Sequence, residues 1–77
     1  MSTIVITGWN QGLDKIALTR TIRQHTGLGL DQSKQCTDEV LEGKPVAFKH
    51  LSQSTAAVFL REVRAIGATG EIREEDT

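Results

Sequence analysis

The chain has 77 residues, which is enough for one small domain and too few for two. Nine basic and ten acidic residues give a formal net charge of −1; 38% of the residues are hydrophobic and 25% are charged. This composition is typical of a soluble globular domain and argues against an intrinsically disordered chain. Because so short a domain buries only roughly 60% of the surface that its unfolded chain exposes, a large enclosed active site is not expected.

The sequence also carries information on the cell compartment. No apolar run approaches the ~20 residues that span a bilayer, and residues 1–6 lack the basic flank and long apolar stretch of a signal peptide. The single cysteine, Cys36, cannot form a disulfide within the chain, which fits a reducing compartment. We therefore expect a cytoplasmic protein.

Charge is unevenly distributed along the chain. Residues 71–77 are mostly acidic, so residues 1–70 keep eight basic and six acidic side chains and a net charge of +2. Residues 15–34 carry a local charge of +3, which fits either a solvated helix face or a basic contact patch for an acidic protein. The charged residues of this segment are Lys15, Arg20, Arg23 and Lys34 against Asp31.

The first third of the chain is expected to form a strand and a helix. Residues 3–7 are all β-branched and predict a strand, and the segment 8–12, with glycine at both ends, predicts a loop. Asp14 is the expected N-cap of a helix over residues 15–26, and Gly27 is its expected C-cap. Three- and four-residue spacing predicts the buried stripe of this helix as Ile16, Thr19, Ile22 and, at its edge, Arg23.

A second helix follows the tight turn at residues 26–30 and is expected to end at Gly43. Asp31 lies in its first turn, where the helix dipole favours a negative charge. Two helices joined this closely form a helix hairpin. One face of the second helix is predicted to hold Leu30, Ser33, Cys36 or Thr37, Val40 and Leu41.

The remainder of the chain predicts a strand, a helix and a strand. The second strand begins at residues 44–45, and its inward side chains are expected to be Val46, Phe48 and His50. A third helix, capped by Ser52 or Ser54 and ended by Gly67, precedes a last strand over residues 68–73. The apolar stripe of the third helix is Ala56, Phe59, Leu60, Val63 and Ile66.

This order of elements predicts the fold class. A three-stranded sheet must cover its apolar face, and three helices are the only cover available. We therefore expect an α+β fold, a two-layer α/β sandwich of order β-α-α-β-α-β, in one domain over residues 1–73 with a frayed acidic tail at 74–77. The sheet face opposite the helices is expected to carry Val5, Ala47 and Thr69, and an exposed strand edge leaves self-association open.

Residues 14–34 resemble the C-terminal domain of the bacterial large-subunit ribosomal stalk protein. The most specific piece is T-G-L-G-L at residues 26–30, followed by Lys34. It is preceded by K-I-A at residues 15–17 and by I-R at residues 22–23, both at the family's spacing. The similarity extends more loosely over residues 14–73, and it implies the same helix-covered three-stranded sheet.

The resemblance implies a docking module without enzymatic activity or a cofactor. In the stalk protein this domain recruits translational GTPase factors through a face made by its first helix and the start of its second. An apolar ridge of Ile16 and Leu30 surrounded by cations would provide a modest anchor and electrostatic steering. The positions that match this face are Lys15, Ile16, Ala17, Thr19, Arg20, Arg23, Gly29, Leu30 and Lys34.

This sequence also departs from the family pattern. The chain starts directly at the domain, so a stand-alone module without the dimerisation region and hinge of the stalk protein is expected. Thr19 stands where the family has an apolar residue, and Asp31 stands where it usually has lysine. Trp9, in its glycine-flanked loop, has no counterpart; it either folds back to cap the sheet or serves as a second exposed contact.

Two alternative functions use the same fold. The cations could bind nucleic acid as part of an accessory protein, although a net charge of −1 and only three aromatic residues argue against strong binding. A module of the protease-adaptor type, which has a related fold, is a further alternative. Metal or acid–base chemistry is not expected, because Cys36, His25 and His50 are not paired at metal-ligand spacing and no nucleophile–base arrangement is present. Cys36 itself is expected to be a buried, inert thiol.

Overall fold

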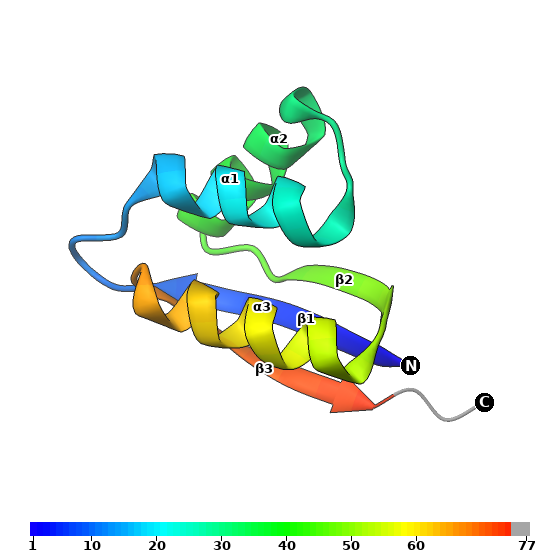
Figure 1. Ribbon diagram of the computed structural model, residues 1–77. Coiled ribbons are helices and arrows are strands. Elements are labelled where there is room, and N and C mark those ends of the chain that lie inside the picture. Colours follow the sequence, from blue (N-terminus) through cyan, green and yellow to red (C-terminus); the bar gives the residue numbers. More distant parts are fainter. Residues whose placement is uncertain (75–77) are drawn as a thin grey trace.

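The computed structural model describes residues 1–74, and its elements follow the predicted order (Figure 1). The α+β fold class is therefore confirmed. The last strand ends at Glu74, one residue beyond the expected domain boundary, and the remainder of the acidic tail, residues 75–77, lies outside the described residues. The elements are β1 (Ser2–Trp9), α1 (Lys15–Thr26), α2 (Leu30–Leu41), β2 (Val46–Leu51), α3 (Gln53–Ala65) and β3 (Ala68–Glu74).

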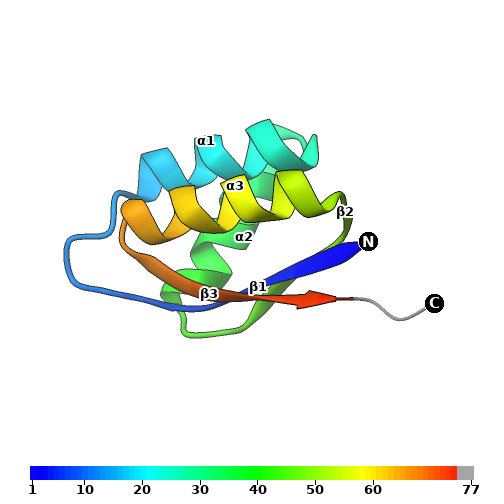
Figure 2. The ribbon, with the colours of Figure 1, turned by 60° about the horizontal axis from the view of Figure 1, so that its bottom comes forward.

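The three strands form one sheet of order β2-β1-β3, with both outer strands antiparallel to β1. Figure 2 shows the helices on one side of this sheet, with α1 farthest from it. Helix α3 packs on β3 and β1, α2 packs on β1 and β2, and α1 packs against both of these helices. Among the described residues, no helix is both long enough and apolar enough to cross a membrane.

Strand β1 is longer than the sequence predicts. The segment 8–12 was expected to be a loop, but β1 continues through Gly8 and Trp9, which pair with Thr69 and Ala68 of β3. The register shifts between Ile6 and Gly8, as in a β-bulge, so the glycine is accommodated within the strand. Pairing with β3 therefore outweighs the local preference of glycine for a turn.

Helix α1 buries a different stripe from the predicted one. Its caps are as expected, because the Asp14 carboxylate accepts the Ala17 N–H at 3.0 Å and Gly27 has a φ of 74°. Ile22 is buried, but Ile16 is 73% exposed and Leu18 is fully buried instead. Since α1 rests on two helices rather than on the sheet, the face through positions 18 and 22 points inward.

Helix α2 and strand β2 each require one correction. Leu30 was expected on the inward face of α2, but it is the first residue of the helix and is 44% exposed. In β2 the predicted alternation fails at His50, which is exposed and has a φ of 63°. This left-handed residue reverses the alternation, so Leu51 is buried in its place.

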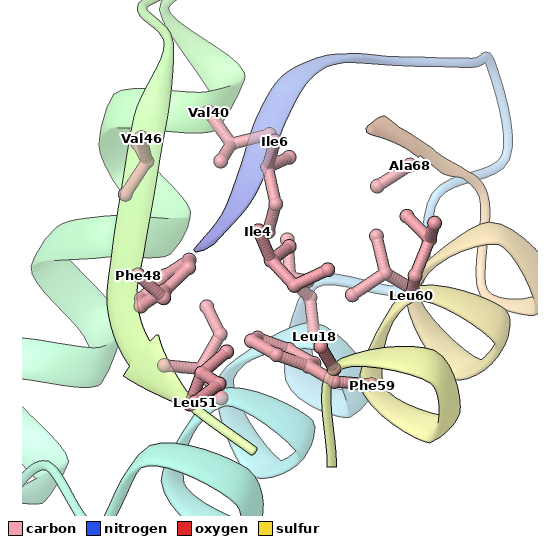
Figure 3. Packing of buried hydrophobic residues seen from close by; sticks show 13 residues of the cluster. Ile4, Ile6, Leu18, Val40, Val46, Phe48, Leu51, Phe59, Leu60 and Ala68 are labelled. Carbon is pink, nitrogen blue, oxygen red and sulfur yellow. The ribbon is translucent and has the colours of Figure 1, made fainter. Parts of the chain in front are cut away.

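The core lies between the sheet and the helices, where Ile4 and Ile6 of β1 are fully buried (Figure 3). Phe48 of β2 meets Phe59 of α3 edge-on, with ring centroids 5.3 Å apart. The stripe predicted for α3 is confirmed, with only the C-cap residue Ile66 partly exposed, and Ser52 rather than Ser54 is the N-cap. Tight packing of these apolar side chains supplies most of the stabilisation of so small a domain.

Within residues 1–74, no helix covers the opposite face of the sheet (Figure 2). Ala47 and Thr69 are exposed there as predicted, but Val5 is only 8% exposed. Val5 lies in the central strand, paired with Ala47 on one side and Glu71 on the other. Neighbouring side chains therefore shield the central strand on this face.

Candidate partner-binding groove

An open groove of about 450 Å³ runs between α1 and α2. Seven of the nine site residues expected from the sequence line it, so the fold brings most of the predicted site together. From α1 these are Lys15, Ile16, Thr19, Arg20 and Arg23, and from α2 they are Leu30 and Lys34; Thr37 and Asp38 of α2 complete the lining.

The turn between the two helices sets the shape of this groove. Gly27 takes the left-handed conformation that ends α1, and Gly29 returns to extended backbone as the N-cap of α2. The Thr26 hydroxyl donates to the Ile22 carbonyl oxygen at 2.6 Å and accepts the Leu28 N–H at 3.3 Å. These contacts fix the reversal of the chain, so the first turn of α2 lies beside α1.

Two threonine hydroxyls connect the helices in the groove. Thr19 Oγ1 and Thr37 Oγ1 are 2.8 Å apart, and Thr37 is only 3% exposed. The polar residue at position 19 therefore has a structural partner on the facing helix. Each hydroxyl also lies near the carbonyl oxygen four residues earlier in its own helix, at 3.1 Å for Thr19 and 3.2 Å for Thr37, so only one of them donates to the other. The contact helps to hold α1 and α2 in a defined relative position.

Apolar and cationic side chains share the exposed surface of the groove. Ile16 and Leu30 are two of the large hydrophobic residues that remain exposed in residues 1–74. The four cations around them are exposed, and no carboxylate of the described residues lies within ion-pair distance of their charged groups. The groove can therefore offer both apolar contact and free positive charge to a partner.

The other predicted site residues lie near the groove without lining it. Ala17 is partly buried and its N–H is engaged by the Asp14 cap. Gly29 is exposed, and a Cβ built on it would meet no atom within 4 Å. Thr37 and Asp38 also line the groove, although neither was expected there from the sequence. Their spacing of three and four residues from Lys34 places them on the same helix face and is the signal that could have identified them.

Trp9 lies apart from the groove, at the other end of α2. The residue is 45% exposed, and its indole Nε1–H donates to the Leu41 carbonyl oxygen at 3.2 Å. Trp9 is therefore held in place by the end of α2 and still presents a large apolar surface. The contact with Leu41 of α2 was not expected from the sequence, and a role of Trp9 as a second contact stays a prediction.

The other potentially reactive side chains, His25 and Cys36, contact residues that stabilise the fold. His25 Nε2 lies 2.5 Å from Glu62 Oε2, and its ring stacks on Phe59, so it joins α1 to α3. Cys36 is partly buried against the core; burial, and then the negative charge of Glu39, raise the pKa of its thiol. Among residues 1–74, His, Cys, Asp and Glu do not gather in groups of three that could hold a metal ion.

No family model matches the sequence, and no curated protein matches it. The class of protein that fold and groove define is a small α+β domain with an exposed helix-hairpin groove.

Proposed function

We propose that this protein is a non-enzymatic, cytoplasmic protein-binding module that docks an acidic protein surface in the groove between α1 and α2. The observation that supports this proposal most strongly is the gathering of exposed Ile16 and Leu30 with four cations in one groove. A translational GTPase factor is the first partner to test, because residues 14–34 resemble the factor-docking segment of the ribosomal stalk domain.

The composition of the groove indicates the kind of binding to expect. Two apolar side chains bury little area, so the complex is weak and dissociates quickly. The unpaired cations accelerate association with a negatively charged surface, and salt screens that attraction. A partner should therefore combine an apolar side chain with carboxylates around it.

An amide NMR titration with a bacterial translational GTPase factor, at low and physiological salt, tests this proposal. We expect shifts or broadening in residues 15–38, with a smaller effect at the higher salt. The double variant Arg23→Glu/Lys34→Glu should lose binding without a change in circular dichroism. The matched control is Lys44→Glu/Lys49→Glu, which makes the same change in net charge on exposed residues outside the groove. Equal binding by both double variants would refute the groove as the docking site.

Nucleic acid is the second candidate partner, because the four groove cations have no carboxylate partner among the described residues. A nucleic-acid complex would lose affinity steeply with salt and would show little sequence preference. Asp38 in the lining and the exposed Ile16 favour a protein partner instead. A titration with single- and double-stranded oligonucleotides under the same conditions distinguishes the two functions.

A further inference from the structure

Strand β3 forms an edge of the sheet, and its exposed side chains carry a self-complementary charge pattern. Within residues 1–74 it pairs with β1 on one side only, and Figure 1 shows it as the outermost strand. Glu71, Ile72, Arg73 and Glu74 are all exposed. An edge strand offers backbone N–H and C=O groups to any further strand that approaches.

The other edge of the sheet is protected against such pairing. Pro45 precedes β2, and Lys49 places an exposed cation within the strand. His50, with its positive φ, interrupts the regular strand geometry one residue before β2 ends. Proline, lysine and irregular backbone are features that block strand addition at a sheet edge. Strand β3 contains none of these three features.

The side chains of β3 alternate between the two faces of the sheet, which determines the residues that a second strand would contact on each face. Ile72 pairs with Ile4, which faces the helices, so Ile72 and Glu74 lie on the helix side of the sheet. Glu71 and Arg73 pair with Val5 and Thr3 and lie on the open side. On that side the guanidinium of Arg73 already contacts the Glu71 carboxylate, with Nη2 to Oε1 at 2.6 Å.

A second copy of β3, placed antiparallel with the two Ile72 residues opposite each other, matches this pattern. Glu71 of each copy then lies opposite Arg73 of the other, which gives two cross-strand pairs of opposite charge. The two Ile72 side chains, each 38% exposed in the single chain, meet on the helix side. In antiparallel pairing this register also sets Gly70 opposite Glu74 of the second copy.

Arg64 adds a second charge complementarity on the helix side. Its Nη2 donates to the Gly70 carbonyl oxygen at 3.0 Å, so the guanidinium lies at the edge of β3. In the register centred on Ile72, the carboxylate of Glu74 from the second copy arrives beside this position. Within its own chain that carboxylate accepts from the Ser2 hydroxyl at 3.0 Å, and the contact with Arg64 replaces this bond. Arg64 can then exchange a neutral carbonyl acceptor for a carboxylate, which forms the stronger hydrogen bond.

We propose that two copies of this protein associate through their β3 edges into a homodimer with a continuous six-stranded sheet. The helices of both copies lie on the same side of that sheet. A single strand pair buries a small area, so the dimer is weak and its population depends on concentration. No residue of the α1–α2 groove belongs to β3, so each copy keeps its groove accessible.

Complementary charge reversals test this interface directly. Glu71→Arg makes residues 71 and 73 both cationic, and Arg73→Glu makes them both anionic. Sedimentation velocity over a concentration series should show the wild-type dimer weakened by about tenfold or more in each single variant, because two like-charged pairs replace two opposite-charged pairs. An equimolar mixture of the two variants should restore the dimer, since each variant complements the other.

The same-chain double variant and one control complete the experiment. In Glu71→Arg/Arg73→Glu the two charges exchange places, so residues 71 and 73 of two copies of this variant again carry opposite charges. This double variant should dimerise like the wild type. Lys49→Glu, on the other edge strand, should leave dimerisation unchanged, and circular dichroism should report the same fold for every variant. A wild type that stays monomeric at the highest soluble concentration overturns the proposal. Dimerisation that persists unchanged in both single variants overturns it as well.

Discussion

The hydroxyl oxygens of Thr19 and Thr37 lie 2.8 Å apart and join α1 to α2 in the groove. The ribosomal stalk domain that residues 14–34 resemble has an apolar residue where this chain has Thr19, so a wetter ridge is expected from the sequence. In the structure the Thr19 hydroxyl contacts the facing helix, and Thr19 is only partly exposed. The substitution therefore contributes to the hairpin as well as to the lining of the groove.

Removal of both hydroxyls should cost less than the sum of the two single removals. Thr19→Val removes the bond between the helices, while the Thr37 hydroxyl keeps its bond to the Ser33 carbonyl oxygen at 3.2 Å, and we expect a loss of about 1 kcal/mol in the free energy of unfolding. In Thr19→Val/Thr37→Val two apolar groups of the same shape face each other, so the double variant should be less destabilised than the sum of the single changes. Urea denaturation of the four proteins measures this coupling.

The exposed pair of Thr7 and Thr69 provides a matched control. Their hydroxyls are 3.3 Å apart across two strands on the open side of the sheet. Because water can replace this contact, Thr69→Val should change the free energy of unfolding by less than about 0.5 kcal/mol. Strict additivity in the Thr19 and Thr37 cycle would contradict the assigned role of that bond.

Ile16 and Leu18 are two positions apart in α1, and replacing each by alanine should affect a different property, partner binding for Ile16 and stability for Leu18. Leu18 is fully buried, so Leu18→Ala should lower the free energy of unfolding by about 2–5 kcal/mol. Ile16 is 73% exposed, so Ile16→Ala should change stability by less than about 0.5 kcal/mol while weakening partner binding in the groove. Thermal unfolding and NMR titration of both variants separate these effects. A strong stability loss in Ile16→Ala would contradict the orientation of α1.

The buried face could be predicted from the sequence for helix α3 but not for helix α1. The stripe of α3 is predictable because that helix packs directly on the sheet and buries one regular face. Helix α1 rests on α2 and α3, so the direction of its inward face depends on how those helices are placed, which no local pattern records. The left-handed backbone of His50 likewise could not be predicted, because a positive φ is uncommon for any residue other than glycine and a single histidine does not specify it.

The site is predictable in part for similar reasons. The cations of α1 and Lys34 follow from the quoted resemblance, and helical spacing then places them on one face. Asp38 was not expected as a lining residue, because the groove lies between two helices. Only the relative position of α1 and α2 shows which residues of α2 face α1. Trp9 could be singled out as unusual, but its bond to the Leu41 carbonyl needs the three-dimensional structure.

An alanine at position 29 should tell whether glycine is needed there for folding or for binding a partner. Its φ is −66°, and a Cβ there would meet no atom within 4 Å, so alanine fits without strain. Gly29→Ala should therefore change the free energy of unfolding by less than about 1 kcal/mol, because the restricted unfolded chain favours alanine and the N-cap position favours glycine. If a partner approaches the backbone here, the same variant binds more weakly in the NMR titration.

Gly67 is the matched control for the Gly29 experiment. Its φ is 105°, and an added Cβ would lie 3.0 Å from Leu13 Cα. Gly67→Ala should therefore destabilise the fold by more than about 1 kcal/mol. A comparable stability loss in Gly29→Ala would show that the turn requires glycine for folding, and would contradict the interpretation of Gly29 as an open surface position.

Cys36 should react slowly with alkylating reagents in the folded protein. Burial against the core and, to a smaller extent, the negative charge of Glu39 raise the pKa of its thiol. Only the thiolate attacks iodoacetamide, so at a given pH the folded chain should be alkylated more slowly than the chain unfolded in urea. Mass spectrometry follows both rates. Equal rates in the folded and unfolded chains would contradict the raised pKa.

The same pKa shift has a defined sign for stability. As pH rises through the ordinary range of a cysteine thiol, the unfolded chain releases the Cys36 proton first, so the unfolded state binds fewer protons than the folded one. The contribution of Cys36 to the free energy of unfolding therefore decreases with rising pH. Cys36→Ala should remove that alkaline decrease, measured as the difference between the urea midpoints of wild type and variant across pH. Glu39→Gln should weaken it, since the nearby negative charge contributes to the shift, whereas Glu42→Gln should leave it unchanged.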